Sequence, residues 1–139
     1  MSARRKAREL TLKALYAYDI SGTDPQQVSN EIIRTSEIKP DAIEFSETLF
    51  LKVVQNIKEI DSLIKSNVKS WDFSRIAAIE KNILRMGICE FLFFDDIPPA
   101  ISMDEAIELA KKYGDKDSKN FVNAMLDSVL KGISTKSRD

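Results

Sequence analysis

The sequence predicts an all-α protein, and three observations support this fold class. The 139 residues contain only four glycines and four prolines, too few for the many turns of a β-sandwich or β-barrel. Apolar residues recur at spacings of three and four along most of the chain, as on the buried face of a helix. No segment of the sequence has the period-two alternation of a half-buried strand. A chain of this length, with 43% hydrophobic and 31% charged residues, can bury one core, so we expect a single domain over 1–139.

The chain should begin with a helix over residues 3–20, which ends at Gly22 because glycine readily adopts the left-handed conformation that closes a helix. Asp24 and Pro25 then predict the N-cap and the first residue of a second, short helix that extends to about residue 37. The core-facing positions expected in the first helix are Ala7, Leu10, Ala14 and Ala17, flanked by Leu15 and Tyr18.

Pro40 interrupts the chain and predicts the start of a long third helix over about 41–68. The apolar positions of this segment follow the three-and-four spacing closely, which predicts one continuous buried face. These positions are Phe45, Leu49, Phe50, Val53, Val54, Ile57, Ile60, Ile64 and Val68.

A polar interruption, Ser-Trp-Asp at 70–72, divides the chain near its middle. We expect two antiparallel groups of roughly three helices each, about 1–70 and 71–139, that share one core. The second group should open with a helical region over 73–95 that contains one break. Its segment 83–94 is apolar nearly all round, which is typical of a helix that is covered on several sides.

Two further helices complete the predicted fold. Ser102 and Glu105 match the S-x-x-E capping box, which predicts the start of a helix over 103–113. The last helix should follow the polar turn that ends at Ser118 and should stop near Gly132, since glycine favours helix ends.

The net charge of −1 is unevenly distributed along the chain. Residues 1–20 carry five cations and two anions, and residues 131–139 carry three cations and one anion, so the remaining body is acidic. Basic ends on an acidic body fit a local anion site better than general coating of DNA. The acidic body also offers a complementary surface to a basic protein partner.

The residue types exclude most catalytic and metal sites. The chain has no histidine, which excludes a Ser-His-Asp triad, a Cys-His dyad and histidine-ligated zinc. Its single cysteine, Cys89, cannot form an internal disulfide, and no glycine-rich phosphate loop is present. We therefore expect no enzymatic activity, no metal and no cofactor. The charged start does not resemble a signal peptide and no apolar stretch is long enough to cross a bilayer, so we expect a cytoplasmic protein.

A cluster of cations opens the first predicted helix. At about 100° per residue, the positions around the helix axis are roughly 0° for Arg4, 40° for Arg8, 100° for Arg5 and 120° for Tyr16. Three guanidinium groups and an aromatic ring would then share one flank and project outward. This combination suits RNA, because cations meet phosphates and planar groups stack on unpaired bases. The alternative is an ordinary solvated helix start, although cations there oppose the helix dipole.

Several candidate residues also have a structural explanation. Tyr16 could lie at the rim of the core, and Asp117 could cap the last helix. A structural ion pair is the alternative role for Glu80. Lys81 and Arg85 lie one turn apart with like charges, so we expect them to find partners on other helices.

Longer segments carry a more specific pattern. They read Ala-Arg-Arg-Lys-Ala-Arg-Glu at 3–9, Lys-Ala-Leu-Tyr at 13–16, Ile-Glu-Lys-Asn-Ile-Leu-Arg-Met-Gly-Ile-Cys-Glu at 79–90, proline at 98, Asp-Glu-Ala-Ile-Glu-Leu-Ala-Lys-Lys-Tyr-Gly at 104–114 and Asp-Ser-Lys-Asn-Phe-Val-Asn-Ala-Met-Leu-Asp at 117–127. In this order they resemble the NusB family of bacterial transcription antitermination factors. The resemblance covers nearly the whole length, and only 21–70 is poorly diagnostic.

The resemblance implies a seven-helix fold in two subdomains and a role in the transcription of ribosomal RNA operons. It implies binding of the boxA element of nascent ribosomal RNA transcripts, jointly with the ribosomal protein that serves as NusE, in an antitermination complex on RNA polymerase. Carboxylates suit such a site because they accept hydrogen bonds from base amino groups. The RNA-binding positions that the resemblance implies are Arg4, Arg5, Lys6, Arg8, Tyr16, Glu80, Asp117 and Phe121.

Two alternative functions stay open at this point. A NusB-like domain also resembles the RNA-binding front module of some ribosomal RNA cytosine methyltransferases. Such enzymes need a separate methyl-donor domain, for which we expect no room in a chain that ends at Asp139. The other alternative is a plain helical protein-interaction domain. The sequence also leaves open whether the protein is a monomer or a homodimer.

Overall fold

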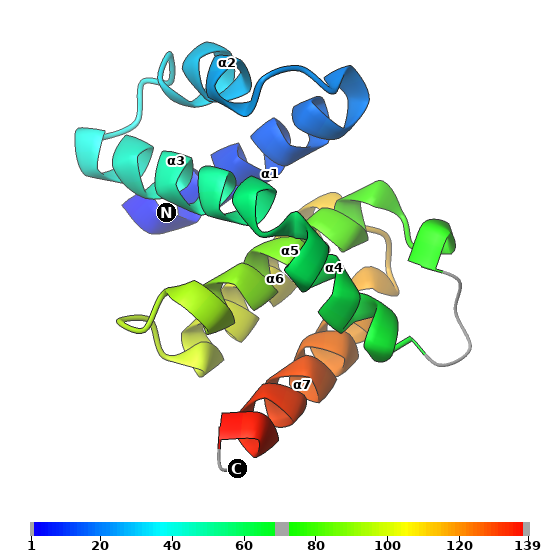
Figure 1. The fold of residues 1–139 in the computed structure, drawn as a ribbon. Helices are drawn as coiled ribbons and strands as arrows, with labels where there is room; N and C mark the ends of the chain where they lie inside the picture. Colours follow the sequence, from blue (N-terminus) through cyan, green and yellow to red (C-terminus); the bar gives the residue numbers. More distant parts are fainter. Residues whose placement is uncertain (1, 69–72, 138–139) are drawn as a thin grey trace. The chain divides into compact units, whose positions relative to one another are not determined.

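The computed structural model describes residues 2–68 and 73–137, and the predicted interruption at 70–72 lies outside them. The described residues form seven α-helices and two short helical turns and contain no strand, which confirms the predicted all-α class (Figure 1). None of these helices combines the length and the apolar character that a bilayer span requires. The chain forms two compact units, 1–55 and 56–139, so their boundary lies earlier than the predicted division near residue 70.

The first unit begins with α1 (Ala3–Ser21), which has the predicted bounds within one residue. The hydroxyl of Ser2 caps its start by accepting a hydrogen bond from the backbone N–H of Arg5 at 3.1 Å. Gly22 ends it in the left-handed conformation, with φ at +62°, and donates its N–H to the carbonyl of Tyr18. The predicted glycine stop is therefore confirmed.

Helix α1 packs against α3 (Pro40–Gln55) through small polar residues as well as apolar ones (Figure 1). The hydroxyls of Thr11 and Ser46 lie 2.9 Å apart in this buried contact, and Thr11 also bonds the carbonyl of Ala7 at 3.0 Å. Short side chains let the two helices approach closely. The buried face of α1 is consequently rotated from the predicted one: Thr11 and Leu12 are buried, whereas Leu10 is half-buried.

The second predicted helix is shorter than expected. Asp24 and Pro25 start it as predicted, with the Asp24 carboxylate accepting from the N–H of Gln27. Helix α2 (Pro25–Val28) passes into the π-helical turn η1 (Ser29–Ile33), so the expected extension to about residue 37 is wrong. The following turn is shaped by hydrogen bonds to α3, which the local sequence pattern does not reveal.

Glu47 on α3 is the centre of these hydrogen bonds. Its carboxylate accepts from the hydroxyl of Ser29, from the amide of Gln26 at 3.2 Å, and from two nitrogens of Arg34 at 2.6 and 3.1 Å. Burial alone would raise the pKa of Glu47, but the hydrogen bonds from Arg34, Ser29 and Gln26 outweigh it and hold the pKa below its usual value. The charged form of Glu47 therefore ties η1 and its following turn to α3.

Replacing Glu47 with glutamine should lower the free energy of unfolding at pH 7 by about 1 kcal/mol, because charge-assisted hydrogen bonds are lost. Since the folded pKa lies below the unfolded value, this stabilisation is present above the unfolded pKa and disappears as the pH falls through the folded pKa. The difference between wild type and Glu47→Gln should therefore shrink as the pH falls below about 4. Urea unfolding, monitored by circular dichroism at pH 7 and at pH 3, measures this difference in the free energy of unfolding. Glu44→Gln on the exposed side of the same helix is the control. An equal loss for both variants at pH 7 would contradict the assignment.

The prediction of one long helix over 41–68 is wrong, because this segment forms two helices. Helix α3 ends at Gln55, and α4 (Ile57–Ser66) begins the second unit. Between them, Asn56 departs from helical geometry, with φ at −116° and ψ at +21°. Asparagine is a poor helix former because its side chain competes for backbone hydrogen bonds. A continuous apolar spacing therefore conceals the point where the chain passes from one unit to the next.

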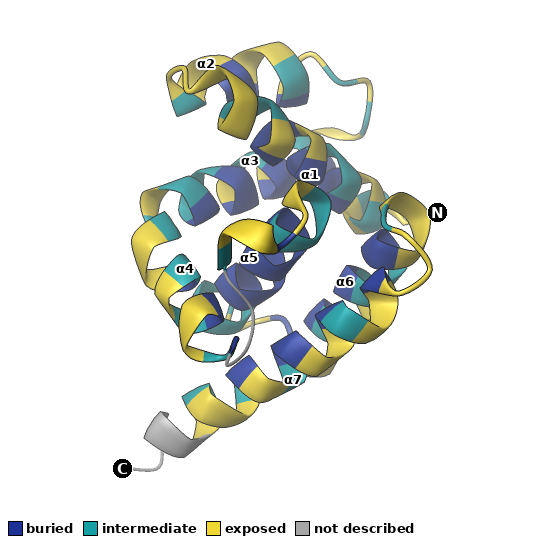
Figure 2. Cartoon of the chain, turned by 90° about the vertical axis from the view of Figure 1, so that its right-hand side faces the viewer, coloured by how far each residue is buried: buried dark blue, intermediate teal, exposed yellow. Residues whose placement is uncertain are grey.

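The second unit is built around α5 (Ala78–Phe93), which packs against α4, α6 (Pro99–Tyr113) and α7 (Ser118–Ser137). Every residue from 82 to 90 is buried, and Figure 2 shows this dark-blue stretch in the middle of α5. The prediction of a helix covered on several sides is confirmed. The predicted break is also confirmed, because the turn η2 (Phe73–Arg75) is separate from α5.

Two predicted helix ends in this unit are wrong. Helix α6 begins at Pro99, and Ser102 lies inside it, where its hydroxyl donates to the buried carboxylate of Glu90 at 2.7 Å instead of capping the helix. Helix α7 continues through Gly132 to Ser137, because this glycine keeps negative φ. In both cases, a residue of a type that often marks a helix end lies inside the helix.

Arg85 has a partner on another helix, as predicted from the like charge of Lys81 one turn away. Its guanidinium donates two hydrogen bonds to the carboxylate of Asp61 on α4, at 2.8 and 2.9 Å, and a third to the amide oxygen of Asn82 at 3.0 Å. Arg85 is only 7% exposed, so this pair connects α4 to the central helix inside the unit. Lys81 instead lies with its ammonium group 4.4 Å from the centre of the Phe73 ring.

Candidate nucleic-acid interface

The predicted RNA-binding residues fall into two sets, one in each unit. The first set lies on α1, and the second set lies at the starts of α5 and α7. The members of the first set are Arg4, Arg5, Lys6, Arg8 and Tyr16, and those of the second are Glu80, Asp117 and Phe121.

Exposed cations occupy the start of α1. Arg4 and Lys6 are exposed, and Arg5 is half-buried. The guanidinium carbon of Arg4 lies 4.5 Å from the centre of the Phe45 ring on α3, a cation–π contact that orients the side chain. The start of the helix therefore presents positive charge to solvent, with one guanidinium held in place by an aromatic ring.

Arg8 departs from the expected arrangement. We expected its guanidinium to project outward with the others, but the residue is only 4% exposed, and its guanidinium lies 5.2 Å from the same Phe45 ring. The helical angles correctly predicted that Arg4 and Arg8 share one flank of α1, as their contacts with the same Phe45 ring show. That flank faces α3, and the angles around one helix cannot reveal which neighbouring helix covers it. A contact of Arg8 with RNA stays a prediction, and it is not supported by exposure.

Tyr16 is available for stacking. It is 44% exposed, and it is followed one turn later by Ile20, which is 70% exposed. Tyr18, by contrast, is half-buried and packs edge-on against Phe50, with ring centres 6.3 Å apart and planes at 85°. The alternative role at the rim of the core therefore fits Tyr18, and the exposed ring belongs to Tyr16.

The second set lies at one end of the second unit. In the chain, α6 follows α5 and runs back along it, and α7 then reverses direction again. Helices α5 and α7 therefore start at the same end of this group (Figure 1). Glu80 is half-buried in the first turn of α5, Asp117 is exposed directly before α7, and Phe121 is half-buried in its first turn. Carboxylates near helix starts are favoured by the helix dipole. The topology thus brings two carboxylates and an aromatic ring to one end.

The structural alternatives for these carboxylates find no support in the described bonds. Within residues 2–68 and 73–137, Glu80 forms no ion pair. The described hydrogen bonds of Asp117 are made by its backbone, which donates to the Asp115 carboxylate at 2.9 Å and accepts from the N–H of Phe121. Both carboxylates are thus open to an external donor.

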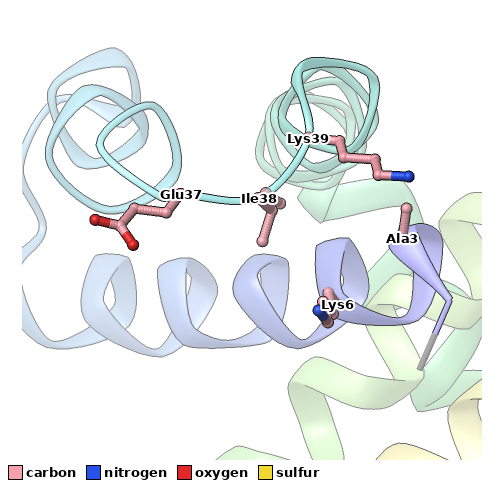
Figure 3. Close-up of a pocket in the computed structure, with 5 residues that line it drawn as sticks. All are labelled: Ala3, Lys6, Glu37, Ile38 and Lys39. Atoms are coloured by element: carbon pink, nitrogen blue, oxygen red, sulfur yellow. The ribbon is translucent and has the colours of Figure 1, made fainter.

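The structure adds cations that the sequence patterns did not single out. The ammonium groups of Lys65 and Lys81 lie 4.9 and 4.4 Å from the centre of the Phe73 ring, close in the chain to Glu80. In the first unit, Lys39 shares a pocket with Lys6 (Figure 3). Neither arrangement has a sequence signal, because the partners belong to separate elements whose contact does not follow from a helical period.

Residues 5–131 match the NusB family. The chain belongs to this family. It is 39% identical over 133 residues to the transcription antitermination protein NusB of a Nitratiruptor species, a similarity that covers 96% of this chain and 95% of that protein. These matches confirm the NusB resemblance of the sequence.

Solved NusB structures share the fold. NusB of T. maritima superposes with a TM-score of 0.85 at 35% identity, over 92% of this chain and 90% of that one. A crystal structure of the antitermination factors NusB and NusE in complex with dsRNA contains a chain with a TM-score of 0.85 at 32% identity, over 95% of this chain and 98% of that one. Membership of this family of transcription factors also confirms that the chain is not an enzyme.

Proposed function

We propose that this NusB-family chain acts as a transcription antitermination factor that binds the boxA element of nascent ribosomal RNA jointly with ribosomal protein NusE. The observation that carries the proposal is the similarity, over 95% of the chain, to a NusB that was crystallised with NusE and dsRNA. The exposed cations at the start of α1 and the exposed ring of Tyr16 support it, because they supply attraction to phosphates and a stacking surface.

The wider context of this function belongs to the same proposal. The complex with RNA and NusE would act on RNA polymerase, in the cytoplasm. A monomer and a homodimer both fit it, and sedimentation of the free protein distinguishes them. The methyltransferase alternative is not favoured, because the chain covers 95% of a relative that is itself named an antitermination protein.

A fluorescence anisotropy titration with boxA RNA and with scrambled RNA, each with and without NusE, tests the proposed function. Tighter binding of boxA RNA than of scrambled RNA, strengthened further by NusE, is the expected result. Equal binding of both RNAs, or no binding of either, would favour the plain helical interaction domain.

Replacing Arg4 and Arg5 together with alanine should weaken boxA binding about tenfold, since two ionic contacts of about 0.7 kcal/mol each sum to one decade. The slope of log affinity against log salt should fall by about 1.4, which corresponds to two phosphate contacts on a single strand. Titrations at several salt concentrations give both numbers. We leave Arg8 out of this variant because it is buried against Phe45, so its removal would disturb packing.

The matched control is the double variant Arg4→Lys plus Arg5→Lys, which keeps both charges. It should retain most of the salt slope while losing the planar guanidinium contacts. An alanine variant with the wild-type slope would show that these arginines do not meet phosphates.

A further inference from the structure

A polar pocket in the first unit joins the start of α1 to the segment that leads into α3. Its volume is about 190 Å³, and it is lined by Ala3, Lys6, Glu37, Ile38 and Lys39 (Figure 3). The space is therefore large enough for several water molecules. A small polar group of a ligand can enter it, whereas a helix cannot.

The charges around this pocket are arranged for an external ligand. Lys6 and Lys39 are exposed, and Figure 3 shows Lys39 reaching toward Ala3 while Glu37 lies on the other side of Ile38. Within the described part of the chain, Lys6, Lys39 and Glu37 form no ion pair. Two cations and one anion thus line one pocket, and none of them is neutralised by another described side chain.

The start of α1 adds to the positive potential on the lysine side. Ala3 is the first residue of a 19-residue helix, and the backbone N–H groups at a helix start favour a negatively charged group. Lys6 follows within the first turn, and Lys39 approaches from the other segment. A phosphate oxygen fits this side of the pocket better than a cation or a basic protein segment.

We propose that this pocket is a subsite for one nucleotide of the RNA, an inference that rests on the proposed function. Lys6 and Lys39 bind its phosphate, and Glu37 accepts a hydrogen bond from the ribose 2′-hydroxyl or from a base amino group. A single ribonucleotide offers both an anionic group and a donor, which matches the two sides of the pocket. Arg5 directly precedes Lys6, about 100° away around the helix axis, so on this side the subsite adjoins the proposed interface.

Two single variants separate the two halves of this subsite. Lys39→Ala should weaken binding of boxA RNA about threefold and lower the salt slope by about 0.7. Glu37→Gln should leave the salt slope unchanged and reduce the preference for boxA RNA over DNA of the same sequence or over scrambled RNA, because the acceptor for a 2′-hydroxyl or base donor is weakened. Lys58→Ala on α4, which removes an exposed lysine of the second unit, is the charge-matched control.

The outcomes distinguish this subsite from the proposed function. If wild type binds boxA RNA and the Arg4/Arg5 variant binds it less tightly, but Lys39→Ala behaves like Lys58→Ala, the subsite is overturned and the function stands. If Glu37→Gln tightens the binding of all probes equally, Glu37 only repels nucleic acid, and its half of the proposal is overturned. If wild type binds no boxA RNA, both proposals fall. Melting curves verify that each variant is folded.

Discussion

The Asp61→Ala variant is expected to unfold with a free energy about 3–5 kcal/mol below that of the wild-type chain, the largest effect on stability predicted for a single polar residue. Arg85 is 7% exposed and donates two hydrogen bonds to Asp61. Removing the carboxylate takes away two charge-assisted hydrogen bonds from a buried guanidinium, so its desolvation penalty is less fully offset. Urea unfolding monitored by circular dichroism measures the loss.

Two controls isolate this cause. Glu108→Ala removes the carboxylate of an exposed pair with Lys111, 3.3 Å long, and should change stability by no more than about 1 kcal/mol. The double variant Asp61→Leu plus Arg85→Met replaces the buried pair with apolar side chains and should recover much of the loss. If Asp61→Ala costs no more than Glu108→Ala, solvent reaches Arg85 and the buried pair is not a determinant of stability.

The second large effect concerns RNA affinity. Tyr16→Ala should weaken binding of boxA RNA by about 1–3 kcal/mol, or roughly 5- to 150-fold, because stacking of a base on an aromatic ring contributes that much. The ring is 44% exposed, so the fold should change little in stability. Anisotropy titrations at fixed salt, accompanied by melting curves, separate affinity from stability.

The controls for Tyr16 use its own ring and its neighbour. Tyr16→Phe keeps the aromatic face and should bind almost as wild type does. Ile20→Ala removes an apolar side chain that is exposed one turn later and should leave the affinity unchanged. If Tyr16→Ala binds as tightly as Tyr16→Phe, stacking on this residue is excluded.

Local backbone chemistry explains which parts of the fold the sequence predicted. Gly22 closes α1 through its own conformation, and Asp24 and Pro25 start α2 through their own side chains. The central helix was also predicted, since a segment that is apolar all round has few alternatives to burial. These signals act within a few residues, and they need no knowledge of the neighbouring helices.

Two of the wrong predictions involve residues whose role is decided by a distant partner. Ser102 resembles a helix cap, but its hydroxyl bonds Glu90 on another helix. Asn56 divides an unbroken apolar spacing where the chain leaves the first unit. Arg8 has the helical angle that the wheel gave, yet its environment comes from Phe45 on α3. Tertiary contacts override the local signals at Ser102 and Arg8, whereas at Asn56 a local break is hidden by the apolar spacing.

At the candidate interface, too, the sequence did not reveal contacts between segments that are far apart in the chain. The helical period indicated the exposed Arg4 and Tyr16, and the NusB resemblance indicated the exposed Lys6. It could not indicate Lys39, which is far from Lys6 in the chain and meets it only across a pocket. Such pairs depend on the path of the connecting segment, for which periodicity carries no information.

The stacking of Arg4 on Phe45 has an entropic consequence. A free arginine side chain samples many rotamers and carries about 2 kcal/mol of conformational entropy, much of which is lost when it grips a ligand. Arg4 is already held 4.5 Å from an aromatic centre, so part of this freedom is surrendered during folding. A polyanion that arrives at the start of α1 meets a side chain that is already restricted in motion, and complex formation is correspondingly less opposed by disorder.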